Sequence, residues 1–347
     1  MSSVLKYLSL KTKFGIASVL ILVIVLVNCA LGWYWSQEPD IFNVKTVAET
    51  RALGMGVQDY SKVEGFVTTS TIITIGETLL NKPGGYLTND VTPPSILLDN
   101  MPSWEYGALV QLRDFTESMR EDLSRSQSQS TENKDLGQAE PKLKFDNNSW
   151  MFPPTESEYK DGLKQMGDYI LALTQSTQDS RNRARFYARA DNLKNLLDHA
   201  SKRLGSISQR LSASVGQRYI NADIAEEVGI KTEQPMNVIS DEGLINQTPW
   251  LEIDNVFYEA RGATWALLHL LKAVEVDFND VLRKKAATAS LKQIIRELEA
   301  TQETLWSPMV LNGKGMGLLA NHSLVMANYV SRANTAIIDL KTLLEQG

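Results

Sequence analysis

Cysteine, histidine and clustered basic residues are scarce in this sequence. Its 347 residues include one cysteine, Cys29, and three histidines. A single cysteine cannot form an internal disulfide, so the fold must be stabilised by burial of apolar side chains. Beyond residue 35 the chain carries 32 Lys and Arg against 41 Asp and Glu, a net charge of −9, with no dense basic run. Nucleic acid is therefore not an expected partner, because binding to a phosphate backbone depends on clustered Lys and Arg.

Strand patterns are missing as well. No stretch shows sustained alternation of apolar and polar residues bounded by turn signals, so no β-sheet is predicted. With 43% hydrophobic and 22% charged residues, the composition is that of a globular protein. The length allows one large domain or two ordinary ones.

One long apolar run is present near the N-terminus. Residues Phe14–Trp35 read FGIASVLILVIVLVNCALGWYW and contain no charge. As a helix this run would extend about 33 Å, enough to cross a hydrocarbon core of about 30 Å. Three aromatic residues at its end suit a membrane–water interface: Trp33, Tyr34 and Trp35. The sequence thus predicts a transmembrane anchor over residues 14–35.

The flanking charges predict the orientation of this anchor. Lys6, Lys11 and Lys13 precede the run, whereas Glu38 and Asp40 follow it. Segments with positive flanking charges stay in the cytoplasm. We therefore expect a cytoplasmic tail over residues 1–13 and a domain outside the cytoplasm over residues 36–347.

A cleaved signal peptide is an alternative interpretation of the apolar run. Ala30-Leu31-Gly32 places small residues at the positions that a signal peptidase requires. The apolar core is longer than that of a usual signal peptide, which favours the anchor. Lipid attachment at Cys29 is disfavoured, because the polar Asn28 stands where a small residue is expected.

Apolar spacing predicts helices in the rest of the chain. Apolar residues step alternately by four and three positions from Phe186 to Leu211, and again from Ile253 to Phe278. A capping box at Thr155–Glu158 begins a third helix, and a fourth is expected from Trp104 to Leu123. Two later segments are also amphipathic: Leu291–Leu305 and Val330–Leu344.

These patterns predict an all-α fold, in which a single N-terminal transmembrane helix is followed by an elongated antiparallel helical bundle. The alternating spacing is typical of helices that cross at roughly 20°. The helix expected over residues 66–80 is the weakest, because Thr and Ile have middling helix propensity. Irregular segments are expected between the helices, at about 84–103, 124–154, 216–247 and 307–320.

The segment 84–107, GGYLTNDVTPPSILLDNMPSWEYG, differs from the helical patterns around it. One interpretation is a structured corner, in which Pro93-Pro94 fixes an extended piece and Ser103 caps the helix that follows. The other is a surface for a partner or ligand, because loops on a rigid scaffold often carry binding residues. The candidate residues of that surface are aromatic or acidic: Tyr86, Asp90, Asp99, Trp104 and Glu105.

Two further motifs resemble binding sites only weakly. The glycine-rich stretch at residues 312–317 lacks the Ser or Thr that a phosphate-binding loop needs after Lys314. The histidines fall on separate predicted helices without metal-ligand spacing, and we expect them on solvated faces: His199, His269 and His322.

Glu156 is the one acidic residue with a specific catalytic interpretation. A glutamate followed by serine also serves as acid and base in helical peptidoglycan lyases, and Ser157 follows it here. Its place in the capping box explains it better, because acidic residues stabilise the first turn of a helix. No catalytic, cofactor-binding or metal-binding residue is therefore predicted.

Four segments resemble a proteobacterial family known only as a domain of unknown function. They are residues 84–114, SRSQSQS at 124–130, FYARADNL at 186–193 and KRLGSISQRLSASVG at 202–216. The resemblance extends over nearly the whole chain. It implies a single-pass inner-membrane protein of Gram-negative bacteria with its main domain in the periplasm, and it implies no activity, cofactor or catalytic residue.

Together these features predict a cell-envelope scaffold or assembly factor that acts through protein contacts, with a homo-oligomer as one form of assembly. A tail of 13 residues is too short to hold a signalling domain of its own. A ligand-sensing module with a pocket near Trp104 is the first alternative. A peptidoglycan-acting enzyme that uses Glu156 is the second.

Overall fold

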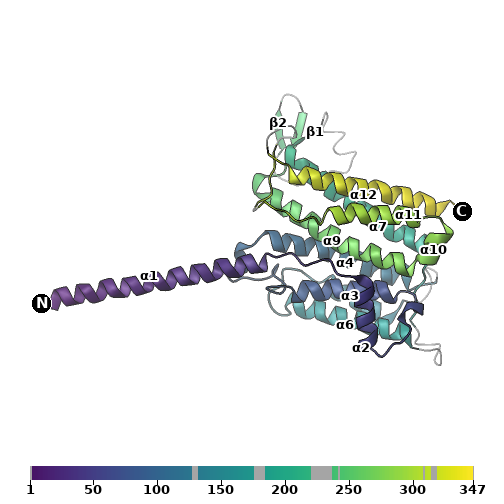
Figure 1. The fold of residues 1–347 in the computed structure, drawn as a ribbon, viewed down its shortest axis with the longest axis horizontal. Coiled ribbons are helices and arrows are strands. Elements are labelled where there is room, and N and C mark those ends of the chain that lie inside the picture. Colours follow the sequence, from purple (N-terminus) through teal and green to yellow (C-terminus); the bar gives the residue numbers. More distant parts are fainter. Residues whose placement is uncertain are drawn as a thin grey trace.

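The fold is a bundle of antiparallel helices preceded by one long helix that projects from it (Figure 1). The computed structural model describes residues 2–126, 132–175, 184–219, 237–240, 243–307, 309–313 and 319–346. The α-helices in these ranges are α1 (Ser2–Trp35), α2 (Val44–Gly54), α3 (Phe66–Asn81), α4 (Asn100–Ser118), α5 (Lys134–Leu143), α6 (Thr155–Thr174), α7 (Ala190–Ser212), α9 (Ile253–Asp277), α10 (Asn279–Lys284), α11 (Thr288–Ala300) and α12 (His322–Glu345). The predicted all-α bundle behind an apolar N-terminal helix is confirmed.

The apolar spacing identified the core-facing residues of α7 correctly. This helix packs mainly against α12, and α11 packs against α12 as well. Its buried apolar side chains repeat at helical spacing: Leu193, Leu196, Leu197, Ala200, Leu204, Ile207 and Leu211. The helix begins at Ala190, whereas Phe186 is buried in the preceding non-helical segment. The prediction therefore placed the start of this helix too early.

Helix α9 lies at the centre of the bundle and is buried on nearly all sides. It contacts α3, α4, α7, α11 and α12. A helix that is apolar all round is expected in a core, and its whole middle from Ala260 to Leu271 is buried. Its last residue, Asp277, accepts a hydrogen bond from the backbone N–H of Thr68 at 2.7 Å. This carboxylate therefore caps α3, the helix that the sequence supported least.

Two glycines allow α4 and α9 to approach closely. A Cβ atom on Gly262 would lie 1.9 Å from the carbonyl oxygen of Trp104, and one on Gly107 would lie 2.0 Å from that of Glu259. Both distances are far below van der Waals contact. The crossing thus requires glycine on both helices.

A small three-stranded sheet corrects the prediction that the chain contains none. Strands β1 (Gln217–Tyr219), β2 (Asn237–Ser240) and β3 (Gly243–Asn246) pair antiparallel in the order β1-β3-β2. In this register Tyr219 pairs with Leu244, and Asn237 pairs with Asn246. The sheet lies beside one end of the bundle and outside its core (Figure 1). Strands of three or four residues are too short to display an alternating pattern.

Helix α5 lies inside the segment 124–154, which was predicted to be irregular. Asn133 caps it by accepting hydrogen bonds from the N–H groups of Asp135 and Leu136. Its apolar face is narrow and buries Leu136, Ala139 and Leu143, in a helix that also contains Pro141. With so few apolar residues and an internal proline, the sequence shows no recognisable helical pattern here.

The predicted start of α4 is also corrected, whereas α6 begins at Thr155 as predicted but without the predicted cap. Helix α4 begins at Asn100, and Ser103 lies inside it, where its N–H and hydroxyl donate to the carbonyl oxygen of Asp99. The hydroxyl of Thr155 does not cap α6, because it donates to the carbonyl oxygens of Asp146 and Ser149. Both hydroxyls bond to carbonyl groups, whereas a capping hydroxyl accepts from N–H groups.

The projecting helix is the one described helix that is long and apolar enough to cross a membrane. The stretch Phe14–Trp35 has a mean hydropathy of 2.8, and its side chains lie almost entirely outside the bundle. A signal sequence near the N-terminus would have the same length and composition. The apolar helix is therefore either a membrane anchor or a signal sequence.

Candidate functional site

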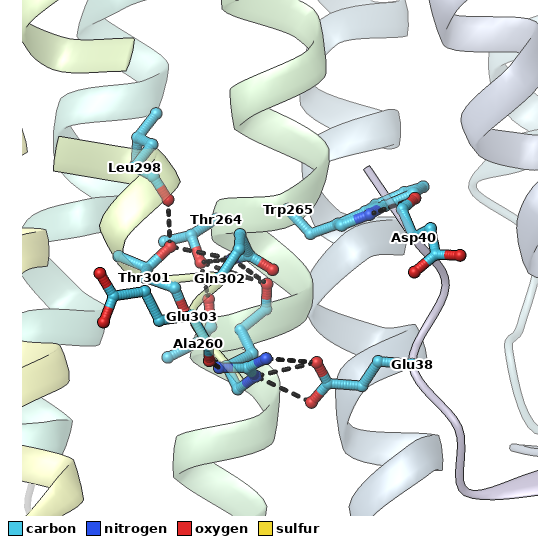
Figure 2. A network of polar contacts seen from close by, with 10 residues as sticks. Glu38, Asp40, Ala260, Thr264, Trp265, Leu298, Thr301, Gln302 and Glu303 are labelled. Carbon is cyan, nitrogen blue, oxygen red and sulfur yellow. Dashed lines mark hydrogen bonds and ion pairs between the residues drawn. The ribbon is translucent and has the colours of Figure 1, made fainter. Parts of the chain in front are cut away.

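The junction between α1 and the bundle is the most elaborate polar site in the described residues. The chain leaves α1 at Trp35 and reaches α2 at Val44 through a non-helical linker, residues 36–43. This linker lies along α9, and three side chains of α9 hold it. The three are Arg261, Trp265 and His269. Figure 2 shows the contacts that Glu38 and Asp40 make.

Arg261 makes the strongest of these contacts. Its guanidinium group donates to both carboxylate oxygens of Glu38, at 2.6 to 2.9 Å. The same group donates to the carbonyl oxygens of Thr301 and Glu303, at 3.1 and 2.9 Å. Arg261 is buried, and its charge is balanced mainly by Glu38, whose side chain is 22% exposed. One side chain thereby joins the linker, α9 and the end of α11.

Trp265 and His269 continue this contact along the linker. The indole N–H of Trp265 donates to the carbonyl oxygen of Asp40 at 3.3 Å, and the backbone N–H of Phe42 donates to Nε2 of His269 at 3.0 Å. The Phe42 ring also stacks on the imidazole, with the ring centres 3.8 Å apart. All three α9 residues therefore hold alternate residues of the linker.

The tautomer of His269 follows from its two hydrogen bonds. Nδ1 lies 2.7 Å from the carbonyl oxygen of Trp265, which can only accept, so Nδ1 carries the proton. Nε2 accepts from Phe42 and carries none. Burial lowers the pKa of His269 to about 4, which keeps the ring neutral and suited to both bonds. His269 was expected on a solvated face and is instead fully buried.

The spacing of these contacts has a simple geometric cause. Glu38, Asp40 and Phe42 advance by two residues, or about 6.6 Å along an extended chain. Their α9 partners advance by four residues, or about 6 Å along a helix. Because the two repeats nearly match, an extended linker running parallel to α9 can place alternate residues against one face of the helix. We call this set of three contacts the linker ladder.

Next to the junction, a buried ion pair organises the segment 84–107. Lys82 and Glu105 are both buried and lie 2.6 Å apart. Glu105 also accepts hydrogen bonds from the backbone N–H of Leu87, the backbone N–H of Thr88 and the Thr88 hydroxyl. The ammonium group of Lys82 donates to the carbonyl oxygen of Gly85. Burial raises the pKa of the Glu105 carboxyl, while Lys82 and the hydrogen bonds lower it.

The five candidate residues of this segment do not gather on one open surface. Tyr86, Trp104 and Glu105 are buried, and Trp104 packs against the Trp265 ring with the centres 5.1 Å apart. Asp90 accepts a hydrogen bond from the Ser95 hydroxyl at 2.7 Å, and Asp99 lies at the N-terminal end of α4. For the three buried residues, these positions favour the structured corner.

Glu156 lies in the first turn of α6 and is half-buried. It accepts a hydrogen bond from the side-chain amide of Asn89, which also donates to the carbonyl oxygen of Ser149. It thus links the segment 84–107 to the loop before α6. Glu156 lines neither of the two hollows discussed below.

Histidines and carboxylates form no metal-binding group among the described residues. His199 is exposed on α7, and Nδ1 of His322 accepts a hydrogen bond from the N–H of Leu311 at 2.9 Å. Most of the glycine-rich stretch, residues 314–317, lies outside the described residues.

Two shallow hollows flank the end of α3. One has a volume of about 550 Å³ and lies between the linker and α3, with Glu38, Asp40 and Lys82 among its lining residues. The other, about 430 Å³, lies between α3 and α6. The first hollow adjoins both the linker ladder and the buried ion pair.

The linker ladder is absent from the patterns that the sequence revealed. Its partners lie 223 to 227 residues apart, so no local spacing relates them. One signal was present in α9. Arg261, Trp265 and His269 place hydrogen-bonding groups at intervals of four in the mostly apolar middle of this helix, which indicates a buried polar partner.

Fold and junction define a class of protein: an antiparallel helical bundle clamped to a long N-terminal apolar helix. Residues 8–347 match the family described as uncharacterised proteins conserved in bacteria (DUF2333), so the chain belongs to this family. The resemblance to a family of unknown function is thereby confirmed. No curated protein and no solved structure matches the chain.

Proposed function

We propose that this chain is a single-pass inner-membrane protein that acts as a scaffold or assembly factor of the bacterial cell envelope. In this proposal residues 1–13 are cytoplasmic, the stretch Phe14–Trp35 spans the membrane, and the bundle lies in the periplasm. The linker ladder is the observation that carries the proposal. It fixes the bundle directly to the helix that crosses the membrane, with no flexible spacer between them.

The contacts of the linker indicate a rigid connection between the apolar helix and the bundle, and not a flexible tether. A flexible tether needs exposed polar residues that make few contacts. Here alternate linker residues hydrogen bond to α9, and the Arg261–Glu38 pair is largely buried. Such a linker holds the bundle at a set height and orientation, which suits a protein that positions partners next to the membrane.

Charge and sequence support the orientation. The three lysines before the apolar run and the acidic residues after it favour a cytoplasmic N-terminus. Reporter fusions test this directly. We expect alkaline phosphatase joined after residue 346 to be active and green fluorescent protein at the same site to be dark. The opposite pair of results would contradict the periplasmic location.

Photo-crosslinking in cells tests the scaffold role. A photoreactive amino acid is placed singly at three exposed positions on different helices: Tyr106 of α4, Leu171 of α6 and Ile338 of α12. We expect discrete adducts with one or a few envelope proteins from one face of the bundle and none from the others. Absence of adducts at every position, or the same smear at all three, would count against protein contacts.

A ligand-sensing module remains the second candidate because of the hollow of about 550 Å³ beside the linker. A ligand there would touch Glu38 and Lys82 and could loosen the linker ladder. The substitution Thr78→Trp would fill this hollow, since Thr78 lines it and is only partly buried. A scaffold keeps its crosslinks in this variant, whereas a sensor that depends on the hollow gains or loses them.

A further inference from the structure

Large apolar side chains are exposed at one end of the bundle. Three of its tryptophans, together with Leu97, Phe152 and Leu251, have exposed fractions between 52% and 92%. They lie in four segments that connect the α-helices. We call these six residues the apolar collar: Leu97, Trp150, Phe152, Trp250, Leu251 and Trp306.

Contacts between the four loops bring the collar together around the end of α1. Asn89 donates to the carbonyl oxygen of Ser149 and so ties the loop before α4 to the loop before α6. Arg261 bonds both Glu38 of the linker and Glu303, three residues before Trp306. Figure 1 shows that α1 joins the bundle at the end where α4 and α9 begin.

Close packing of α4 against α9, which begin at the same end of the bundle, brings in the last of the four loops. Asp99 precedes α4, and Asp254 lies in the first turn of α9, three residues after Leu251. Burial raises the pKa of Asp254, and the negative charge of Asp99 raises it further. The start of α9 therefore lies beside the loop that carries Leu97.

The position of this loop along α1 sets the depth of the collar. A Cβ atom on Gly32 would lie 3.7 Å from side-chain atoms of Leu98 and of Pro94. Gly32 is three residues before the end of the apolar run, about 4.5 Å along the helix axis. Leu97 and its neighbours are therefore level with the last turn of the apolar helix. If α1 spans a bilayer, this is the depth of the membrane–water interface.

Two of the collar loops are fixed by their own hydrogen bonds. The Ser95 hydroxyl donates to Asp90 and holds the turn that carries Leu97. The Ser149 hydroxyl donates to the carbonyl oxygen of Pro153 at 2.8 Å and closes the loop that carries Trp150 and Phe152. Phe152 has a φ of 63°, a conformation that is costly for an aromatic residue. The backbone thus holds this ring outward, and it is 91% exposed.

We propose that the apolar collar inserts into the outer interface of the lipid bilayer in which α1 is anchored. Tryptophan and phenylalanine suit this depth, because their rings are apolar and the indole N–H can still bond to water or headgroups. Insertion would add contacts on several sides of the anchor and prevent the bundle from tilting on it. The inference rests on the proposed function, since it requires α1 to span the membrane.

A lipid surface fits the collar better than a second protein does. The loop that carries Leu97 packs against the apolar helix α1 at Gly32, so a bilayer that contains α1 also meets this loop. Acidic residues flank it along the chain, which leaves apolar insertion as the attraction: Asp99, Glu252 and Glu303. Zwitterionic lipid should therefore suffice.

Site-specific labelling of the full-length chain in nanodiscs tests the inference. Cys29 is the only cysteine, so Cys29→Ser gives a background for single cysteines at collar positions: Leu97→Cys, Trp250→Cys and Trp306→Cys. Leu53→Cys on α2 is the matched control, because Leu53 is 73% exposed and Leu97 is 75% exposed. Each cysteine carries a fluorophore, and the nanodiscs contain phosphatidylcholine with or without brominated chains.

We expect brominated lipid to reduce the fluorescence of all three collar labels and to leave the Leu53 label unchanged. The native Cys29, labelled in the unsubstituted chain, reports on the anchor itself. Quenching at Cys29 without quenching at the collar would overturn the inference and leave the anchor in place. No quenching at Cys29 would overturn the proposed anchor and the collar with it. Circular dichroism checks that each variant is folded.

Discussion

The junction at α1 and the α7–α12 pair are stabilised in different ways. In the pair, apolar residues repeat along each helix and pack against the other, with Leu197 and Leu204 of α7 and Ile337 of α12 fully buried. At the junction, the linker contributes carboxylate, carbonyl and N–H groups, and one side chain of α9 forms a hydrogen bond with each of them. One region depends on burial and the other on buried hydrogen bonds.

The difference has a consequence for what each region tolerates. An apolar contact can shift slightly and keep much of its free energy, because dispersion and burial have no strict direction. A buried hydrogen bond that loses one partner leaves the other unsatisfied, which costs more than the bond was worth. The junction should therefore be more sensitive to single substitutions than its small area suggests.

Arg261→Ala should have the largest effect on stability. It leaves the Glu38 carboxylate and two carbonyl groups without their donor, so we expect the free energy of unfolding to fall by about 4 kcal/mol. Urea unfolding of the detergent-solubilised full-length chain measures this change. Arg332→Ala is the control, because its bridge to Glu297 is half-exposed and should contribute less than about 1 kcal/mol. Equal losses of unfolding free energy in the two variants would contradict the greater sensitivity of the junction to single substitutions.

Gly262→Ala should have the next largest effect. The added methyl group would meet the Trp104 carbonyl oxygen at 1.9 Å and force α4 away from α9. Overpacking of this kind costs about 3 kcal/mol when backbone atoms must move. Gly167→Ala in α6 is the matched control, because nothing lies within 4 Å of its Cβ position and alanine favours a helix by about 1 kcal/mol. We expect thermal unfolding to show a loss of stability for Gly262→Ala and a gain for Gly167→Ala. No change in stability for Gly262→Ala would show that the crossing of α4 and α9 can relax.

Apolar spacing predicted most of the bundle but not its boundaries. The repeats in α7 and α9 are long and regular, so they identified both helices and their buried faces. Boundaries were missed where tertiary contacts set them, as at Asn100 and Ala190. The sheet was missed because its strands hold three or four residues, too few for a pattern.

The candidate site was predicted in part. The glycines and prolines of the segment 84–107 favoured a structured corner over a binding surface, but no local pattern indicated that Lys82, just before the segment, and Glu105, within it, form a buried pair. The histidines were treated alike, although only His269 is fully buried. Burial depends on which helix occupies the centre of the bundle, and that follows from packing among helices distant in sequence. The linker ladder was missed for the same reason.

The smallest expected effect is a change in the pH dependence of stability, contributed by one titratable group at the junction and one at the end of α9. Burial lowers the pKa of His269 to about 4, at the junction, and raises the pKa of Asp277 to about 6, at the cap of α3. The stability that His269 contributes is present above its unfolded pKa of about 6.5 and is lost as the pH falls toward 4. The contribution of Asp277 has the opposite sign: it is present below about 3.8 and is lost as the pH rises through 6.

Between about pH 8 and about pH 5 the two contributions therefore oppose each other, and substitution separates them. Relative to the unsubstituted chain, His269→Gln should retain about 2 kcal/mol more of its stability on acidification, because its ring no longer binds a proton on unfolding. Asp277→Asn should retain about 1 kcal/mol less, because the proton taken up by the folded state is lost. Urea unfolding at the two pH values measures both differences. Shifts of the same sign would show that at least one of these groups titrates as it does in the unfolded chain.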